Sequence, residues 1–176
     1  RPADANETLE AWRIALNHTQ GPTTLIFSRQ NLPVLDRSVY TSASGTRQGG
    51  YVLWESAPVP DVILIATGSE VSLALAAARK LAAADKKTRV VSMPSWELFD
   101  RQPRDYRDKV LPPQISARIA VEAGIKLGWE HYVGLGGKII GMETFGASAP
   151  APVLYEKFGI TVEKIVEAAN ELHRRA

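Results

Sequence analysis

Short apolar runs alternate with amphipathic stretches from about residue 61 to the end of the chain. The stretches 69–84 and 161–174 have helical periodicity, and shorter helical pieces are expected through Trp96 and Tyr106. The apolar runs have the length and near-continuous hydrophobicity of parallel strands that are buried on both faces. They lie at residues 62–66, 88–92, 118–121 and 138–141. This alternation predicts a three-layer α/β domain with a mainly parallel sheet.

The first 35 residues have a different pattern. Asp4 or Asn6 can cap a helix that has a broad apolar face and ends near Gly21. That face consists of Leu9, Trp12, Ile14 and Leu16. The apolar run 23–27 then predicts a short buried strand. One helix cannot cover both faces of a strand, so we expect the strand to belong to a sheet whose other strands lie outside this chain, and the chain to be a fragment.

A stretch of linker composition separates these two parts. Residues 36–60 are rich in Gly, Ser, Thr and Pro and are interrupted by the apolar run 51–54. We interpret 51–54 as an antiparallel edge strand of the second domain, with Gly49 and Gly50 as its flexible entry. The predicted division is therefore 1–55, a partial α/β domain tail with a linker, and 56–176, the three-layer domain.

Composition and charge narrow the classes of function. The 176 residues are 45% hydrophobic and 23% charged, which is typical of an ordinary globular protein. The formal net charge of +2 is small and both signs are interspersed, so no surface for nucleic acid or an anionic membrane is expected. The chain has no cysteine, which excludes disulfides and thiol catalysis. Because nothing resembles a signal peptide or a membrane span, a cytoplasmic location is the default expectation.

Arg29 is the strongest candidate for a binding residue. It follows the apolar run 23–27, and Asn31 and Pro33 end the extended stretch and open a loop. The carboxyl ends of strands are where α/β folds place ligand-binding groups, and a guanidinium presents a planar fork of donors that matches a phosphate or carboxylate. From these residues alone, a salt bridge at the surface or between domains is the alternative.

A second candidate lies at Thr67, Gly68 and Ser69, between the run 62–66 and the helix after it. Free N–H groups and the helix dipole at such a helix start can hold a nucleotide or phosphate, including one that acts as a regulator. The stretch has one glycine rather than a dinucleotide-binding fingerprint. In addition, Thr67 and Glu70 can form a capping box that fills the site internally.

Other polar residues give weaker signals. Glu122 and Glu143 follow predicted strands, where catalytic carboxylates can lie, but for Glu122 a carboxylate that accepts loop N–H groups is the favoured interpretation. His131 and the carboxylate before it are adjacent helical residues, which make a poor proton-transfer pair. His18 and His173 are typical of helix C-termini. No metal-ligand spacing occurs, so no metal site is expected.

Several long motifs, in the same order, resemble the transketolase family along nearly the whole chain. They include Arg-Pro-Ala-Asp-Ala-Asn-Glu at 1–7, Ser-Arg-Gln-Asn-Leu-Pro at 28–33, Ala-Thr-Gly-Ser-Glu-Val at 66–71 and Phe-Gly-Ala-Ser-Ala-Pro at 145–150. The resemblance implies that 1–55 is the tail of the family's pyrimidine-binding domain with a linker. It also implies that 56–176 is the transketolase C-terminal domain.

The resemblance carries expectations about function. The family transfers a two-carbon ketol unit between sugar phosphates, using thiamine diphosphate and magnesium at a site formed by a homodimer. Arg29 matches the family's arginine that holds the substrate phosphate. The chain lacks the family's Gly-Asp-Gly motif for magnesium and diphosphate, its catalytic glutamate and its substrate histidines. Without the missing N-terminal domains we therefore expect no catalytic residue, no bound cofactor and no activity, but a phosphate-binding arginine and a scaffold for dimer packing.

Two alternatives remain open. Residues 61–176 can be a ligand-binding regulatory module that uses the helix start at 67–70 and the strand ends near Ser92 and Glu122. The chain can also be the small subunit of a split transketolase or of an enzyme like dihydroxyacetone synthase.

Overall fold

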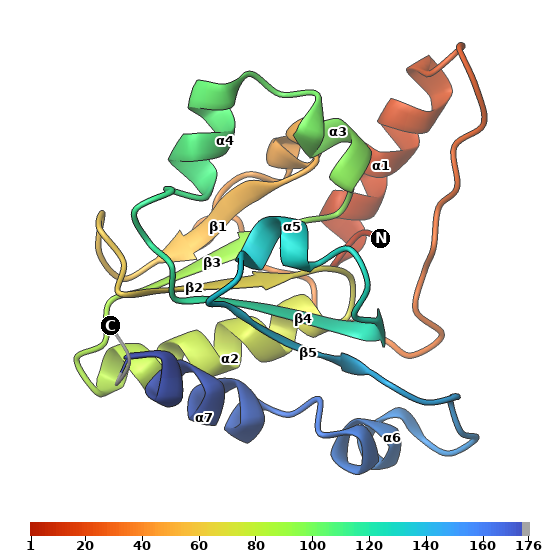
Figure 1. The fold of residues 1–176 in the computed structure, drawn as a ribbon. Coiled ribbons are helices and arrows are strands. Elements are labelled where there is room, and N and C mark those ends of the chain that lie inside the picture. Colours follow the sequence, from red (N-terminus) through yellow and green to blue (C-terminus); the bar gives the residue numbers. More distant parts are fainter. Residues whose placement is uncertain (174–176) are drawn as a thin grey trace.

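The computed structural model describes residues 1–173, in which one five-stranded sheet lies between two layers of helices (Figure 1). The strands are β1 (Tyr51–Glu55), β2 (Val62–Ala66), β3 (Thr88–Ser92), β4 (Arg118–Ile125) and β5 (Lys138–Met142). In the order β1-β3-β2-β4-β5, β1 runs antiparallel to β3 and the other neighbours are parallel. The predicted mainly parallel sheet with an antiparallel edge strand is confirmed.

Helices cover both faces of this sheet. On one face lie α2 (Glu70–Ala83) and α7 (Val162–His173), which confirm the helices predicted at 69–84 and 161–174, although residue 174 lies outside the described residues. On the other face lie α3 (Trp96–Asp100), α4 (Arg104–Val110) and α5 (Glu130–Val133). The helical state assumed for His131 and the residue before it agrees with α5, whereas the sequence reasoning missed α6 (Ala151–Phe158), which precedes α7.

Successive residues of β2 enter two different cores. Val62 and Leu64 belong to the core that α2 and α7 cover, whereas Ile63 and Ile65 belong to the core that contains Phe99, Trp129 and Tyr132. These four β2 residues are at most 1% exposed. Because neighbouring side chains of a strand point to opposite faces, burial of all four requires helices on both sides of the sheet. Burial on both faces therefore explains why residues 62–66 form a continuous apolar run in the sequence.

The predicted first helix is present, but its apolar face is not covered. α1 (Ala5–Asn17) begins after Asp4, whose Oδ1 accepts a hydrogen bond of 2.8 Å from the Glu7 N–H, and it ends at Asn17, earlier than expected. Leu9, Trp12 and Leu16 are 54%, 49% and 78% exposed. The described residues therefore leave most of this face open to solvent.

The buried strand predicted at 23–27 is wrong for this chain. Residues 22–28 form neither a strand nor a helix, and Ile26 and Phe27 are 54% and 49% exposed. A strand needs a hydrogen-bonded neighbour, and none of the residues up to 173 pairs with this segment. The apolar run indicates a segment that is suited to burial, but it does not indicate whether a neighbouring strand belongs to the same chain.

The entry to β1 is tightly packed rather than flexible. A short 3₁₀ helix, η1 (Ala43–Gln48), ends at Gly49, which has a φ of 81°. A Cβ atom at Gly49 would lie 2.2 Å from the Phe99 nitrogen and 2.4 Å from the Ser95 carbonyl oxygen. Glycine is required here by both the backbone conformation and the approach of α3.

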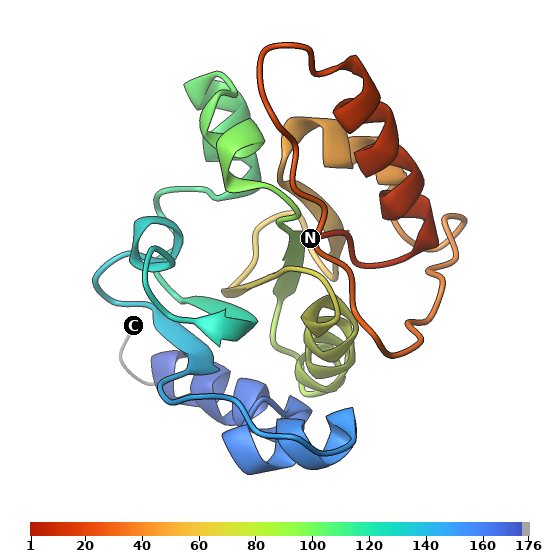
Figure 2. The ribbon, with the colours of Figure 1, turned by 90° about the vertical axis from the view of Figure 1, so that its right-hand side faces the viewer.

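The parallel strands end at one edge of the sheet, which Figure 2 views with the N-terminus at its centre. α2 follows β2 on one face, whereas α5 follows β4 on the other, and β2 and β4 are neighbours. The chain connections thus diverge between these two strands. In α/β sheets, a crevice of this kind at the carboxyl ends of the strands is the usual place for a ligand.

Candidate functional site

Arg29 lies in the loop between α1 and η1, and its side chain is exposed. Among residues 1–173 it has neither a hydrogen bond nor an ion pair, so its guanidinium does not form the salt bridge that was the alternative interpretation. All its donors are therefore available to an anion. The phosphate-binding role itself stays a prediction.

The residue after Arg29 connects this loop to the second part of the chain. The Gln30 Nε2 atom donates a hydrogen bond of 3.3 Å to the hydroxyl of Tyr155 on α6. That hydroxyl in turn donates a bond of 2.7 Å to the Glu70 Oε1 atom at the start of α2. Burial and the Glu70 carboxylate raise the pKa of Tyr155 to about 12, so the hydroxyl remains a donor at neutral pH.

Glu70 is the centre of a buried polar network. Its side chain has no exposed surface, and Oε1 also accepts a hydrogen bond of 2.7 Å from Ser69. The Oε2 atom accepts 3.0 Å from the Ala123 N–H and pairs with the Arg1 guanidinium at 3.3 Å. Each carboxylate oxygen thus has two donors, which is what makes a buried carboxylate tolerable.

Arg1 occupies the crevice between β2 and β4. Its guanidinium also binds Glu122, whose Oε2 atom accepts a bond of 2.7 Å from the Trp129 indole. The Arg1 nitrogen donates 2.9 Å to the Pro94 carbonyl after β3. The Glu70 carboxylate after β2, the Glu122 carboxylate within β4 and the Pro94 carbonyl after β3 therefore hold Arg1 at the edge where a ligand would otherwise bind.

The helix start at Thr67, Gly68 and Ser69 has its donors engaged by the chain itself. The Arg1 carbonyl oxygen accepts 3.1 Å from the Gly68 N–H and 3.2 Å from the Thr67 hydroxyl. Ser69 donates to Glu70, which accepts from residues of the network rather than closing a capping box with Thr67. An external anion at this position would have to displace Arg1, and such a site stays a prediction.

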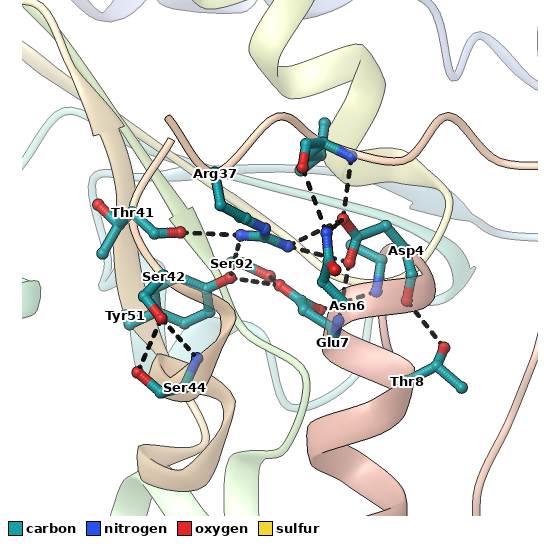
Figure 3. Close-up of polar contacts among 12 residues, drawn as sticks. Asp4, Asn6, Glu7, Thr8, Arg37, Thr41, Ser42, Ser44, Tyr51 and Ser92 are labelled. Carbon is teal, nitrogen blue, oxygen red and sulfur yellow. Dashed lines mark hydrogen bonds and ion pairs between the residues drawn. The ribbon is translucent and has the colours of Figure 1, made fainter. Parts of the chain in front are cut away.

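A second buried cluster ties α1 to the sheet (Figure 3). The Glu7 Oε1 atom accepts bonds of 2.7 Å from both the Tyr51 hydroxyl on β1 and the Ser92 hydroxyl at the end of β3. Its Oε2 atom accepts 2.8 Å from the Ala3 N–H, and the side chain is fully buried. Burial and the Glu7 carboxylate raise the pKa of Tyr51. The strand end at Ser92 is thus filled by a side chain of the first helix.

Asp4 and Arg37 extend this cluster. The Arg37 Nη2 atom donates 2.9 Å to each oxygen of Asp4, while Nη1 donates 3.1 Å to the Tyr51 hydroxyl and 2.9 Å to the Thr41 carbonyl (Figure 3). Asp4 also caps α1, so one carboxylate fixes both the helix start and the segment that leads into η1. This cluster was not found from the sequence, although Asp4 and Glu7 both lie in the motif at 1–7.

One pocket of about 380 Å³ lies between residues 23–26, the segment 93–98 after β3, and Glu122 of β4. Its lining includes Arg1, Ile14, Trp96 and Glu122, but not Arg29. The only guanidinium on its wall is that of Arg1, which already binds two carboxylates. The pocket and the candidate phosphate residue are therefore separate features.

The remaining candidates from the sequence do not assemble into a catalytic group. Glu143 forms an exposed ion pair with Lys126, whose hydrogen bond and charge hold the pKa of that carboxyl below its usual range. His131 lies 3.6 Å from an oxygen of Asp100. Within residues 1–173, no group of three or more His, Cys, Asp or Glu side chains is placed to hold a metal ion.

The family of the chain follows from its similarity to known proteins. The family model of the transketolase-like TK C-terminal domain matches residues 49–161, which is more than half of the chain. Transketolase 2 of Vibrio parahaemolyticus is 55% identical over 172 residues, which are 98% of this chain and 26% of that protein. Transketolase 1 of Escherichia coli is 53% identical over the same shares.

Solved structures agree with this match. The transketolase from Leishmania mexicana has a TM-score of 0.89 and 46% sequence identity, covering 99% of this chain and 25% of that one. The transketolase from Pichia stipitis, solved in complex with sedoheptulose-7-phosphate, has a TM-score of 0.87 and 37% identity over the same shares. The chain therefore spans about a quarter of the length of the relatives it matches, and it belongs to the transketolase family.

Proposed function

We propose that this chain is the C-terminal part of a transketolase, which moves a two-carbon ketol unit between sugar phosphates with thiamine diphosphate and magnesium. Arg29 supplies the guanidinium that binds the substrate phosphate, and residues 56–176 act as a scaffold. The observation that carries this proposal is the exposed Arg29 guanidinium, which has no partner among residues 1–173. The complex of the Pichia stipitis relative with a sugar phosphate supports the class of substrate.

The scaffold role is supported by what fills the carboxyl edge of the sheet. The two strand-end positions that a regulatory ligand would use are engaged by the first segment: Ser92 binds Glu7, and Glu122 binds Arg1. A regulatory module would need these positions for a ligand. The arrangement instead favours a tight connection between residues 1–7 and the three-layer domain, which is what domain packing requires.

The described residues do not fit the cofactor by themselves. They contain no carboxylate and histidine group for a metal ion, and the helix start at 67–69 presents its donors to Arg1 and lies beside the buried Glu70 carboxylate. A magnesium diphosphate would there have to displace the Arg1 carbonyl oxygen from the Gly68 and Thr67 donors, beside a buried carboxylate. We therefore assign cofactor binding to the remaining three-quarters of the longer protein.

The uncovered apolar surface supports the need for further protein. Leu9, Trp12 and Leu16 of α1 and Ile26 and Phe27 of the segment 22–28 are each about half exposed or more. Such a set of large apolar side chains indicates an interaction surface. We propose that the N-terminal domains of the same polypeptide cover it, and that the intact enzyme is a cytoplasmic homodimer. None of the helices described in residues 1–173 is long and apolar enough to cross a membrane.

An assay of two proteins tests this proposal. The longer protein that contains this chain and the 176-residue chain alone are assayed for ketol transfer, each with and without thiamine diphosphate and magnesium. We expect transfer only by the longer protein and only with the cofactor. Transfer by the chain alone, or without the cofactor, would contradict the proposal. A native product of 176 residues bound to a second polypeptide would favour the split-subunit alternative.

A further inference from the structure

Arg29 lies on a long irregular segment, so something must hold its position. No helix or strand forms between the end of α1 at Asn17 and the start of η1 at Ala43. A segment of this kind samples many conformations unless side chains tether it, and ordering it on ligand binding weakens affinity. The Arg29 side chain has no tether of its own among residues 1–173.

The neighbouring residue supplies the tether. Gln30 donates its 3.3 Å bond to Tyr155, which lies 125 positions further along the chain. Ser28, on the other side of Arg29, donates a bond of 3.1 Å to the Gln30 carbonyl oxygen and closes a local turn around Arg29. The Gln30 side chain is therefore the connection that the structure provides between this turn and α6.

The hydroxyl at the other end of this connection is fixed. Tyr155 directs its single proton to Glu70, so the lone pairs of its oxygen are left to accept from Gln30. Glu70 cannot move to follow a mobile tyrosine, because Ser69, Ala123 and Arg1 also hold its buried carboxylate. The hydrogen bonds that start at Gln30 thus end at Glu70, the buried carboxylate of α2.

We propose that Tyr155 is a positioning residue for substrate-phosphate binding, acting through Gln30 on the Arg29 turn. This inference rests on the proposed phosphate role of Arg29. It gives the three-layer domain a specific part in substrate binding, because a residue of that domain pre-orders the turn that meets the sugar phosphate. Pre-ordering reduces the entropy lost on binding and so lowers KM for phosphorylated substrates without changing the chemical step.

The test uses the intact longer enzyme with Tyr155→Phe, which removes only the hydroxyl, and Gln30→Leu, which removes the amide. Each is assayed with a five-carbon aldose 5-phosphate and with the same aldose without its phosphate. We expect each variant to raise KM for the phosphorylated acceptor roughly two- to tenfold, the change typical of one neutral hydrogen bond. We expect kcat at saturation and the kinetics of the unphosphorylated acceptor to stay unchanged.

Two comparisons separate positioning from a general structural effect. Tyr106→Phe removes another tyrosine hydroxyl, one that donates 2.9 Å to the Gly50 carbonyl away from this network, and it should leave KM unchanged. The double variant of Gln30 and Tyr155 should be no worse than either single variant, since both remove the same connection. Because Gln30 is exposed, Gln30→Leu keeps the test valid even where Tyr155→Phe unfolds the protein.

Failure of this inference differs from failure of the proposed function. If Arg29→Ala impairs phosphorylated acceptors selectively while Gln30→Leu and Tyr155→Phe leave their KM unchanged, Arg29 binds phosphate and the positioning role is wrong. If Arg29→Ala has no selective effect, the proposed phosphate role fails first. Equal losses for both acceptors in Tyr155→Phe would also overturn the positioning role and would indicate damage to the fold.

Discussion

The hydroxyl of Tyr51 donates a 2.7 Å hydrogen bond to Glu7, a carboxylate with no exposed surface. The pair joins the edge strand β1 to the first helix, although 44 positions separate the two residues. The Ser92 hydroxyl and the Ala3 N–H donate to the same carboxylate (Figure 3). Glu7 therefore connects β1, the end of β3 and the segment before α1.

Glu7→Ala should destabilise the protein strongly. It leaves the Tyr51 and Ser92 hydroxyls and the Ala3 N–H without their buried acceptor, which should lower the free energy of unfolding by about 2 to 4 kcal/mol. Urea unfolding of the 176-residue chain measures this change. Glu167→Ala is the matched control, because its carboxylate lies in an exposed pair with Lys164 and should cost less than about 1 kcal/mol. Similar losses for both variants would refute the anchoring role of Glu7.

Alkaline pH should weaken the fold through Tyr155. Its pKa is raised to about 12 in the folded chain, above the value near 10 expected when unfolded. The folded state then holds the proton more tightly, so the contribution of Tyr155 to stability is complete below about pH 10 and is lost as the pH rises towards about 12. Urea midpoints of the chain and of Tyr155→Phe at several pH values from 8 to 12 should converge at high pH. A constant difference between them would contradict this expectation.

The uncovered face of α1 predicts opposite effects in two contexts. In the 176-residue chain, Leu16→Glu replaces an apolar side chain that is 78% exposed and should increase solubility without lowering the urea midpoint. In the longer protein the same change should reduce stability, because it places a charge where we expect the N-terminal domains to pack. Leu135→Glu, at a fully exposed turn, is the control and should have little effect in either protein. No destabilisation of the longer protein by Leu16→Glu would argue against packing on this face.

The sheet and its main helices could be predicted because burial of an element requires apolar residues at a regular spacing within its own short sequence. β2 is a continuous apolar run since it lies inside the sheet, β3 has the apolar pair Val90 and Val91 at its centre, and α7 carries one apolar stripe since one side packs on the core. For α6, Pro152 near its start and Gly159 after its end were available signals, but the helix has no buried residue and hence no clear stripe. The strand prediction for residues 23–27 was wrong although the apolar run is clear, since no strand among the described residues pairs with it.

The position of Arg29 could be inferred from its sequence neighbours, but its surroundings could not. The contact between Gln30 and Tyr155 joins residues that no local pattern relates, and the same holds for Arg1 with Glu70 and Glu122. The motif at 66–71 indicated a possible anion site because the sequence shows the free donors of a helix start but not the carbonyl oxygen that reaches them from residue 1. Long-range pairs of this kind depend on the completed fold.

Arg29→Ala in the longer enzyme tests the phosphate role of Arg29. The variant should lose roughly 2 to 4 kcal/mol of transition-state binding with phosphorylated substrates, the range for a charged partner removed from a binding site. Arg29→Lys should recover only part of this loss, because an ammonium lacks the planar fork of donors. Arg104→Ala, at an exposed arginine on α4, is the control and should change nothing.

The quantity to measure is the ratio of kcat/KM for a phosphorylated acceptor to kcat/KM for the same acceptor without phosphate. We predict that Arg29→Ala lowers this ratio at least about 30-fold, with the unphosphorylated acceptor nearly unaffected. An unchanged ratio, with equal losses for both acceptors, would contradict the phosphate role of Arg29 and would indicate that the residue supports the fold instead.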